Sequence, residues 1–273
     1  MRLIAEIGTN FDPDDPLEAL KTAQENGADI VKIQLFRAKT LYAVPELQER
    51  VRPFEFEPEW LKDWDGCPVW ATVFDIELAE QALPYVKGLK VASGDLVYQK
   101  IVESTARLAS ETNIPLALST GAATEAEIKQ ALDWVQPFPV KELILFQCVS
   151  VYPAEPKDYN LRAILPFRKY VDTIGLSDHT TSYITAMLAR ALGYEVFERH
   201  FKFQETWQKP VTPPDWGAWA FTPSAFWEYR FMIEWADEIL GTGMKRVMED
   251  ESDERVWARR GSDGRRPIDV ARD

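Results

Sequence analysis

Two stretches of the sequence decide its fold: residues 175–180, GLSDHT, and residues 196–201, VFERHF. Each belongs to a short apolar run that is typical of a β-strand, and each places one of the chain's two histidines near the C-terminal end of that strand. The distance along the chain between His179 and His200 suits one strand–helix–strand step of a parallel sheet. The two imidazoles are therefore expected on adjacent parallel strands, at the same edge of the sheet.

Similar apolar runs recur along the chain and alternate with helical patterns. Most are continuous and end in polar residues, which is typical of strands buried on both faces of a parallel sheet. Eight such strands, each followed by a helix or by room for one, predict an α/β fold, the (β/α)8 TIM barrel. A doubly wound open sheet is the alternative, but it would need a glycine-rich phosphate loop early in the chain, and residues 8–12, GTNFD, do not form one. The predicted strands are 3–8, 30–34, 69–74, 89–93, 115–120, 143–148, 173–178 and 196–201, and the predicted helices are 16–26, 98–111, 125–135, 180–192 and 224–240.

Length and charge narrow the classes of function. The chain has 273 residues, 46% of them hydrophobic, which suits one barrel-sized domain or two small ones. A net charge of −13 argues against nucleic acid and anionic membranes as partners, so any site for an anionic substrate must be locally basic. Only Cys67 and Cys148 are present, which gives no disulfide framework. With no leader pattern and no long apolar run, the protein is expected to be cytoplasmic.

The domain prediction is a barrel over residues 1–245 and a charged C-terminal extension over residues 246–273. Residues 37–58, which follow the second predicted strand, are expected to form an extended loop over the mouth of the barrel. The extension is rich in both acidic and basic side chains, which is typical of a solvated segment.

Polar side chains follow every predicted strand at its C-terminal end, where TIM barrels place their chemistry. Lysines there suit phosphate or carboxylate groups, and hydroxyls can complete a phosphate cradle. Two imidazoles on adjacent strands can converge on one divalent metal ion. Each residue also has a structural interpretation: a histidine can be a buried hydrogen-bonded residue, a lysine can extend to solvent, and a serine can cap a helix. The ring comprises Glu6, Lys32, Gln34, Thr72, Lys90, Ser93, Ser119, Thr120, Ser150, Tyr152, Ser177, His179, Glu198 and His200.

Seven of these motifs, in order and with matching spacing, resemble the sialic acid synthase (N-acetylneuraminate synthase) family. They are residues 4–10 (IAEIGTN), 31–34 (VKIQ), 90–95 (KVASGD), 118–121 (LSTG), 148–153 (CVSVYP), 175–179 (GLSDH) and 198–201 (ERHF). The resemblance implies an enzyme that condenses phosphoenolpyruvate with an aldose such as an N-acetylated hexosamine. The products would be a 2-keto sugar acid and phosphate, and the resemblance is compatible with a homodimer.

The resemblance also implies roles for individual residues. His179 and His200 would be ligands of a divalent metal ion, with Mn2+ expected before Mg2+ or Co2+. Glu6 would be the acid or base near the reacting carbons. Asp215 would contact the sugar, and Lys32 and Lys90 would act in catalysis. The residues that would bind the substrates are Lys32, Lys90, Asn10, Gln34, Thr72, Ser93, Ser119, Ser150, Tyr152, Ser177 and Asp215.

Three features depart from the family pattern. Phe11 stands where the family usually has histidine, so either that role is dispensable here or the acceptor differs. The family's C-terminal antifreeze-like domain, whose arginine binds the N-acetyl group, is not expected in a chain that stops at Asp273. Residues 205–219 carry Trp207, Trp216 and Trp219, which either pack at an interface or stack on a sugar. Segment 37–58, segment 205–219 and the arginines of the extension are the candidates to close the acceptor pocket.

Two classes of function follow from these observations. The first is the sugar-acid synthase, with an aldolase-like reaction on another acceptor as its variant. The second is a barrel that binds a sugar phosphate or a partner without catalysis. The presence of Glu6, both lysines and both histidines favours an enzyme, because a simple binding protein has no need of a paired metal site.

Overall fold

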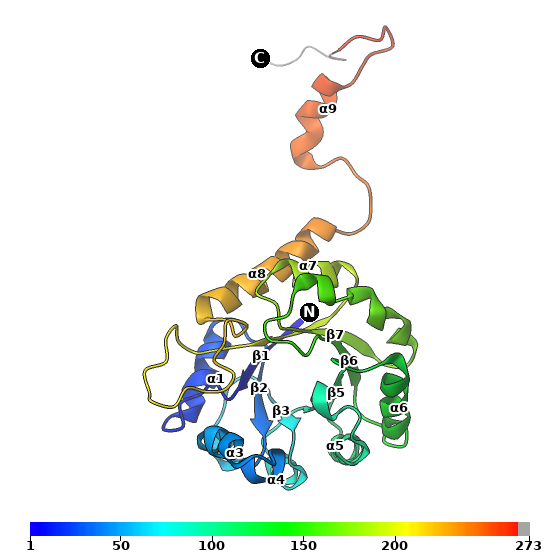
Figure 1. The fold of residues 1–273 in the computed structure, drawn as a ribbon. Coiled ribbons are helices and arrows are strands. Elements are labelled where there is room, and N and C mark those ends of the chain that lie inside the picture. The colour runs from blue at the N-terminus through cyan, green and yellow to red at the C-terminus, as the bar shows by residue number, and fades with distance from the viewer. Residues whose placement is uncertain (267–273) are drawn as a thin grey trace. The chain divides into compact units, whose positions relative to one another are not determined.

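Eight parallel strands form a closed barrel in which each strand pairs with its neighbours in sequence order and β8 closes on β1. The structure is a computed structural model, and it describes residues 1–266. Figure 1 shows the strands at the centre and the helices around them. The predicted TIM barrel is confirmed, and the observed strand ends differ from the predicted ones by at most two residues. The strands are β1 Arg2–Gly8, β2 Ile30–Leu35, β3 Val69–Val73, β4 Leu89–Val91, β5 Leu116–Ser119, β6 Leu143–Gln147, β7 Thr173–Asp178 and β8 Val196–His200.

The helices follow the strands around the outside of the barrel. Five of them were predicted, whereas the short α4 and the 3-10 helix after β6, which contains Pro166, carry too few regular apolar repeats to be found. The α-helices are α1 Pro16–Glu25, α2 Ala38–Leu41, α3 Pro45–Val51, α4 Ile76–Ala82, α5 Gln99–Glu111, α6 Glu125–Val135, α7 Ile184–Ala191, α8 Pro223–Leu240 and α9 Ser252–Ala258. The 3-10 helices are η1 Arg52–Phe54, η2 Pro58–Leu61, η3 Ser93–Asp95, η4 Pro156–Asp158, η5 Leu161–Lys169 and η6 Glu249–Glu251.

An apolar layer fills the barrel beneath its polar end. Because side chains alternate along a strand, five of the seven residues of this layer lie two positions before a polar residue on the same face. Ile4 thus precedes Glu6, and Val196 precedes Glu198. This packed layer closes the barrel below, so the polar side chains above it lie at the C-terminal mouth. The layer consists of Ile4, Ile30, Trp70, Ala117, Ile144, Phe146 and Val196, all buried.

Residues 37–58 do not form the extended loop that was predicted. They contain α2, α3 and the 3-10 turn η1, and α3 begins with Pro45, a residue suited to the first turn of a helix. Phe54 and Phe56 are buried, and both rings contact Phe11 edge-on, with centroids 6.0 and 5.6 Å away. The apolar burial of these phenylalanines holds the segment against the barrel.

The helix after β7 begins four residues later than predicted. Residues 180–183 form turns instead, because the Asp178 carboxylate accepts hydrogen bonds from the Thr180 amide at 2.9 Å and from its hydroxyl at 2.8 Å. Side-chain bonds of this kind compete with helical ones. The turns leave His179 at the mouth of the barrel rather than within a helix.

The chain divides into two compact units, Met1–Asp237 and Glu238–Asp273. In the second unit, the described residues comprise the last turn of α8, η6 and α9, and almost all of them are exposed. Among the residues that the structure describes, none of the helices is both long enough and apolar enough to span a membrane.

Candidate active site

A cavity of about 410 Å3 opens at the C-terminal ends of the strands. Twelve of the fourteen residues predicted to act in catalysis or to bind substrate or metal line it. They are Glu6, Lys32, Gln34, Thr72, Lys90, Ser93, Ser119, Tyr152, Ser177, His179, His200 and Asp215. Residues distributed over the whole chain therefore meet in one place because every strand ends at this mouth.

Ser150 and Asn10 are the two predicted residues that do not line this cavity. The Ser150 hydroxyl lies 2.8 Å from that of Ser93, next to the cavity wall. The Asn10 side chain is buried and donates hydrogen bonds to the backbone carbonyls of Phe201 at 3.0 Å and Asp215 at 3.1 Å. In this structure Asn10 joins the loop after β1 to the loop after β8, which places Asp215.

Two lysines and two glutamates form a buried charged floor. The Lys32 ammonium forms an ion pair with Glu6 and donates a hydrogen bond to the Thr72 hydroxyl at 2.6 Å. The Lys90 ammonium lies 2.6 Å from one carboxylate oxygen of Glu198, and that of Lys32 lies 3.7 Å from the other. Sequence reasoning placed Glu198 in the polar ring but gave it no role. One feature of the sequence did indicate a role: Glu198 lies two residues before His200 on the same strand, so both side chains point to the same face.

The two glutamates differ in how readily they ionise. Burial works against ionisation of Glu198, but Lys32 and Lys90 outweigh it and lower its pKa to about 2. Burial raises the pKa of Glu6 to about 7, because Lys32 offsets that effect only in part and the charge of Glu198 adds to it. Near neutral pH, Glu198 is thus a fixed anion, whereas Glu6 can exchange a proton.

The two imidazoles lie side by side at the mouth, with ring centroids 5.5 Å apart. The Nδ1 atom of His179 is 2.6 Å from the backbone carbonyl of Val149, which can only accept a hydrogen bond. The proton of the neutral ring therefore sits on Nδ1. The Nε2 atom lies 3.3 Å from the Ser177 hydroxyl, which donates to Glu198, so the Nε2 lone pair can bind a ligand. Burial lowers the pKa of His179 to about 4 and that of His200 well below its usual value, so both rings are neutral.

These features fit a divalent metal ion. A neutral imidazole whose far N–H is bound to a backbone carbonyl is the usual form of a metal-binding histidine. The Nδ1 atom of His200 is buried and has no hydrogen-bond partner among the described residues. No group of three or more histidine, cysteine or acidic side chains within residues 1–266 is arranged to hold a metal, so the protein ligands would be these two.

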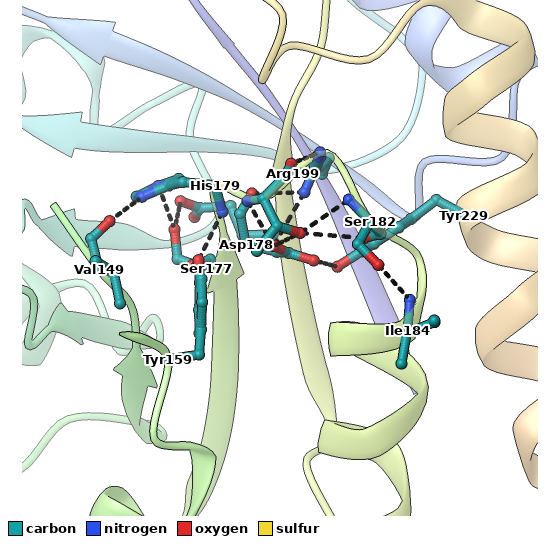
Figure 2. A network of polar contacts seen from close by, with 11 residues as sticks. Val149, Tyr159, Ser177, Asp178, His179, Ser182, Ile184, Arg199 and Tyr229 are labelled. Atoms are coloured by element: carbon teal, nitrogen blue, oxygen red, sulfur yellow. Dashed lines mark hydrogen bonds and ion pairs between the residues drawn. The ribbon is translucent and has the colours of Figure 1, made fainter. Parts of the chain in front are cut away.

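A second set of buried charges lies next to His179 (Figure 2). Arg199 and Asp178 are fully buried, and their side chains form an ion pair at 3.0 Å. The Tyr229 hydroxyl of α8 donates to Asp178 at 3.1 Å, and the guanidinium of Arg199 lies 3.5 Å from the centroid of the Phe221 ring. The pair thus ties the end of β7 to β8 and α8 directly beside His179.

The Tyr159 hydroxyl fixes the backbone at His179 itself. It accepts a hydrogen bond from the His179 amide at 2.6 Å and donates one to the Ser177 carbonyl at 2.8 Å, as Figure 2 shows. Tyr159 is buried. The Tyr159 hydroxyl therefore holds the backbone of His179, while the Val149 carbonyl holds its ring.

Asp215 reaches the cavity from the loop after β8. Its carboxylate accepts a hydrogen bond from the Thr9 amide at 3.0 Å, and burial raises its pKa despite that bond. Gly8 has a positive φ of 56°, and a Cβ atom there would lie 2.3 Å from the Asp215 carboxylate. Glycine is thus required at position 8 both by the backbone conformation and by this close approach.

Phe11, by contrast, does not face the cavity. Its ring is fully buried and packs edge-on against Phe54, Phe56 and Trp60. The aromatic side chain at this position therefore contributes to the packing of segment 37–58, and it does not line the cavity.

Taken together, the fold and the cavity define a TIM-barrel protein whose mouth combines a charged floor with paired neutral imidazoles. The chain matches the NeuB family over residues 19–243 and belongs to that family. It is similar to the N,N'-diacetyllegionaminic acid synthase of Legionella pneumophila, with 30% identity over 97% of this chain and 80% of the relative. The pseudaminic acid synthase of Helicobacter pylori is 28% identical over 77% of this chain and 68% of its own length.

This chain is also similar to a protein of known structure. The N-acetylneuraminic acid (sialic acid) synthetase from Leptospira borgpetersenii, crystallised with citrate, superposes with a TM-score of 0.78 and 27% identity. The match covers 92% of this chain and 89% of that chain. These relatives are named for different sugar acids, so the similarity leaves the choice of sugar to be argued from this chain's own cavity.

Proposed function

We propose that the protein is a phosphoenolpyruvate-dependent sugar-acid synthase. The observation that carries the proposal is the charged floor: two lysines, held by two buried glutamates, beside two neutral imidazoles. In the reaction, C3 of phosphoenolpyruvate attacks the aldehyde carbon of an open-chain aldose such as an N-acetylated hexosamine. Water adds to C2, the bond between C2 and the phosphate oxygen breaks, and the products are a 2-keto sugar acid and phosphate.

The lysines bind the anionic substrate. Phosphoenolpyruvate carries a phosphate and a carboxylate, and the ammonium groups of Lys32 and Lys90 are the cations of the cavity floor. Each would bind one anionic group by a charge-assisted hydrogen bond. The hydroxyl of Ser119 is buried and has no hydrogen-bond partner within residues 1–266, which supports a role in the same cradle.

Glu6 moves the proton. The Gln34 amide donates a hydrogen bond to Glu6 at 2.8 Å, so the carboxyl group is held in one orientation. A group with a pKa of about 7 can accept the proton of the attacking water and return it to the leaving group. Glu198 remains ionised and keeps the two lysines in place.

His179 and His200 would hold a divalent metal ion, with Mn2+ expected first. When bound, such an ion acts as a Lewis acid on the aldehyde oxygen and favours attack at the carbon. The protein's part is to keep both rings neutral and oriented, through burial and the Val149 carbonyl. Calorimetry should find one Mn2+ site in the parent protein and none in His179→Ala or His200→Ala. Undiminished binding in both variants would contradict this assignment.

Release of phosphate tests the proposed reaction. Phosphoenolpyruvate is supplied with Mn2+, with and without a panel of aldoses that includes N-acetylated and free amino-hexoses. We expect phosphate release that depends on one of these sugars, and a new 2-keto acid in equal amount. Release that does not depend on any sugar would contradict the condensation. No release with any sugar while both ligands bind would favour the non-catalytic barrel. The same assay on Lys90→Ala tests the anion cradle. Its matched control is Lys87→Ala, at an exposed lysine outside the cavity.

A further inference from the structure

Trp219 lines the cavity and carries an unpaired hydrogen-bond donor. It lies on the loop between β8 and α8 and lines the cavity beside Pro214 and Asp215. Its indole Nε1 atom is buried and has no hydrogen-bond partner among the described residues. Buried N–H groups are nearly always paired in folded proteins, and an indole nitrogen can only donate. The missing partner is therefore an acceptor atom that the protein itself does not supply.

The loop is built to hold the indole in this place. Its backbone is closed by hydrogen bonds from the Gly217 amide to the Asp215 carbonyl at 2.9 Å and from the Ala220 amide to the Gly217 carbonyl at 3.2 Å. A Cβ atom on Gly217 would lie only 2.0–2.3 Å from atoms of the Trp219 ring. The ring thus folds back over Gly217, and only glycine leaves space for it.

The ring's neighbours indicate which substrate it meets. Trp219 contacts Tyr152 edge-on, with ring centroids 5.7 Å apart. Tyr152 in turn lies 4.2 Å from the centroid of His179 and 5.7 Å from that of His200. The indole is thus connected to the imidazole side of the cavity through Tyr152. In the proposed reaction the sugar aldehyde is polarised at this side, whereas the lysines hold phosphoenolpyruvate.

We infer that the Trp219 N–H donates a hydrogen bond to an oxygen of the acceptor sugar and so helps to determine which sugar is used. This inference rests on the proposed function. The oxygen is a hydroxyl or an amide carbonyl, because a protonated amine has no lone pair to offer. A site with a buried donor of this kind discriminates against substrates that leave the donor unpaired.

Two variants and a control test the contact. Trp219→Phe removes the N–H but retains an aromatic ring, and Gly217→Ala forces the indole away from its place. In both, we expect the KM for the sugar to rise about tenfold, the effect of losing one buried hydrogen bond, and the KM for phosphoenolpyruvate to stay within twofold. Trp216→Phe is the control, because that indole packs on Trp207 and Phe203 and does not line the cavity.

The outcomes separate this inference from the proposed function. An unchanged KM for the sugar in Trp219→Phe, or a rise confined to phosphoenolpyruvate, would overturn the contact even in an active enzyme. If the parent releases no phosphate with any sugar, the proposed function fails, and the contact is tested by calorimetric titration of the same sugars. Weaker sugar binding by Trp219→Phe than by Trp216→Phe would then support it. Equal binding, or no sugar binding by the parent, would overturn it.

Discussion

The inner and outer faces of β7 and β8 carry buried charges of very different kinds. On the inner face, Ser177 and Glu198 line the cavity, and the Ser177 hydroxyl donates to Glu198 at 2.9 Å. The next residues along the same strands, Asp178 and Arg199, point to the outer face, where α8 and the turn at 180–183 cover them. Alternation along a strand thus separates, by a single residue, charges that meet substrate from charges that meet only protein.

The difference shows that burial alone does not identify a functional charge. Asp178 and Arg199 are fully buried and paired with each other, but neither borders the cavity. The inner charges are buried almost as deeply, two lysines against two glutamates, yet their side chains border the open cavity. The outer face is therefore expected to determine stability, and the inner face binding and rate.

Removing the outer arginine should have the largest effect. Arg199→Ala leaves the Asp178 carboxylate buried without its cation, and breaking a buried pair in this way costs about 3–5 kcal/mol. We expect urea denaturation to show a loss of that size, and Arg199→Lys to recover it only in part, because lysine cannot reproduce the planar stacking on Phe221. A loss below about 1 kcal/mol, the usual value for an exposed pair, would show that the outer face is not the stabilising one.

Removing an inner lysine should affect ligand binding before stability. Lys90→Ala takes one cation from the anion cradle, a charge-assisted contact of about 1.5–3 kcal/mol. Glu198 keeps Lys32 at 3.7 Å as a second cation, so its charge is not left alone. Calorimetry should show phosphoenolpyruvate affinity about 10- to 150-fold weaker, with Lys87→Ala unchanged. A collapse of the melting temperature with unchanged affinity in the folded fraction would make Lys90 structural.

The pH dependence should identify Glu6. A base with a pKa of about 7 loses its ionised form about tenfold per pH unit below that value, so kcat/KM should fall accordingly, about 1.4 kcal/mol per unit. The pKa is raised above the ordinary 4.5, so this group's contribution to stability is complete below pH 4.5 and is lost as the pH rises through about 7. In Glu6→Gln, both kcat/KM and the free energy of unfolding should lose this dependence on pH. An inflection near pH 7 that persists in Glu6→Gln would assign it to another group.

The sequence predicted the barrel and most of the cavity because both depend on local patterns. Continuous apolar runs identify strands buried on both faces, and the polar residues that end them must meet at one mouth. The pairing within the floor could not be predicted in this way. That Glu198 holds Lys90, at 2.6 Å, depends on distances across the barrel between residues far apart in sequence.

The directions of side chains outside the strands also could not be predicted from the sequence. Phe11 occupies the position at which the family usually carries histidine, yet its ring packs against Phe54 and Phe56. Only the folded segment 37–58, which was expected to be an extended loop, explains that direction. Likewise, the three tryptophans of segment 205–219 look equivalent in the sequence, but only Trp219 lines the cavity.

The smallest expected effect tests the boundary between the two faces. Tyr229→Phe removes one hydroxyl from Asp178 and retains the ring near the Arg199 guanidinium, so the ion pair persists. Loss of one such hydrogen bond should lower the free energy of unfolding by about 1 kcal/mol. If the outer face acts only on stability, kcat and both KM values should match those of the parent at a temperature where each protein is fully folded. A fall in kcat with unchanged stability would instead show that the outer pair positions His179, since Asp178 precedes it directly, and the separation of the two faces would then be incomplete.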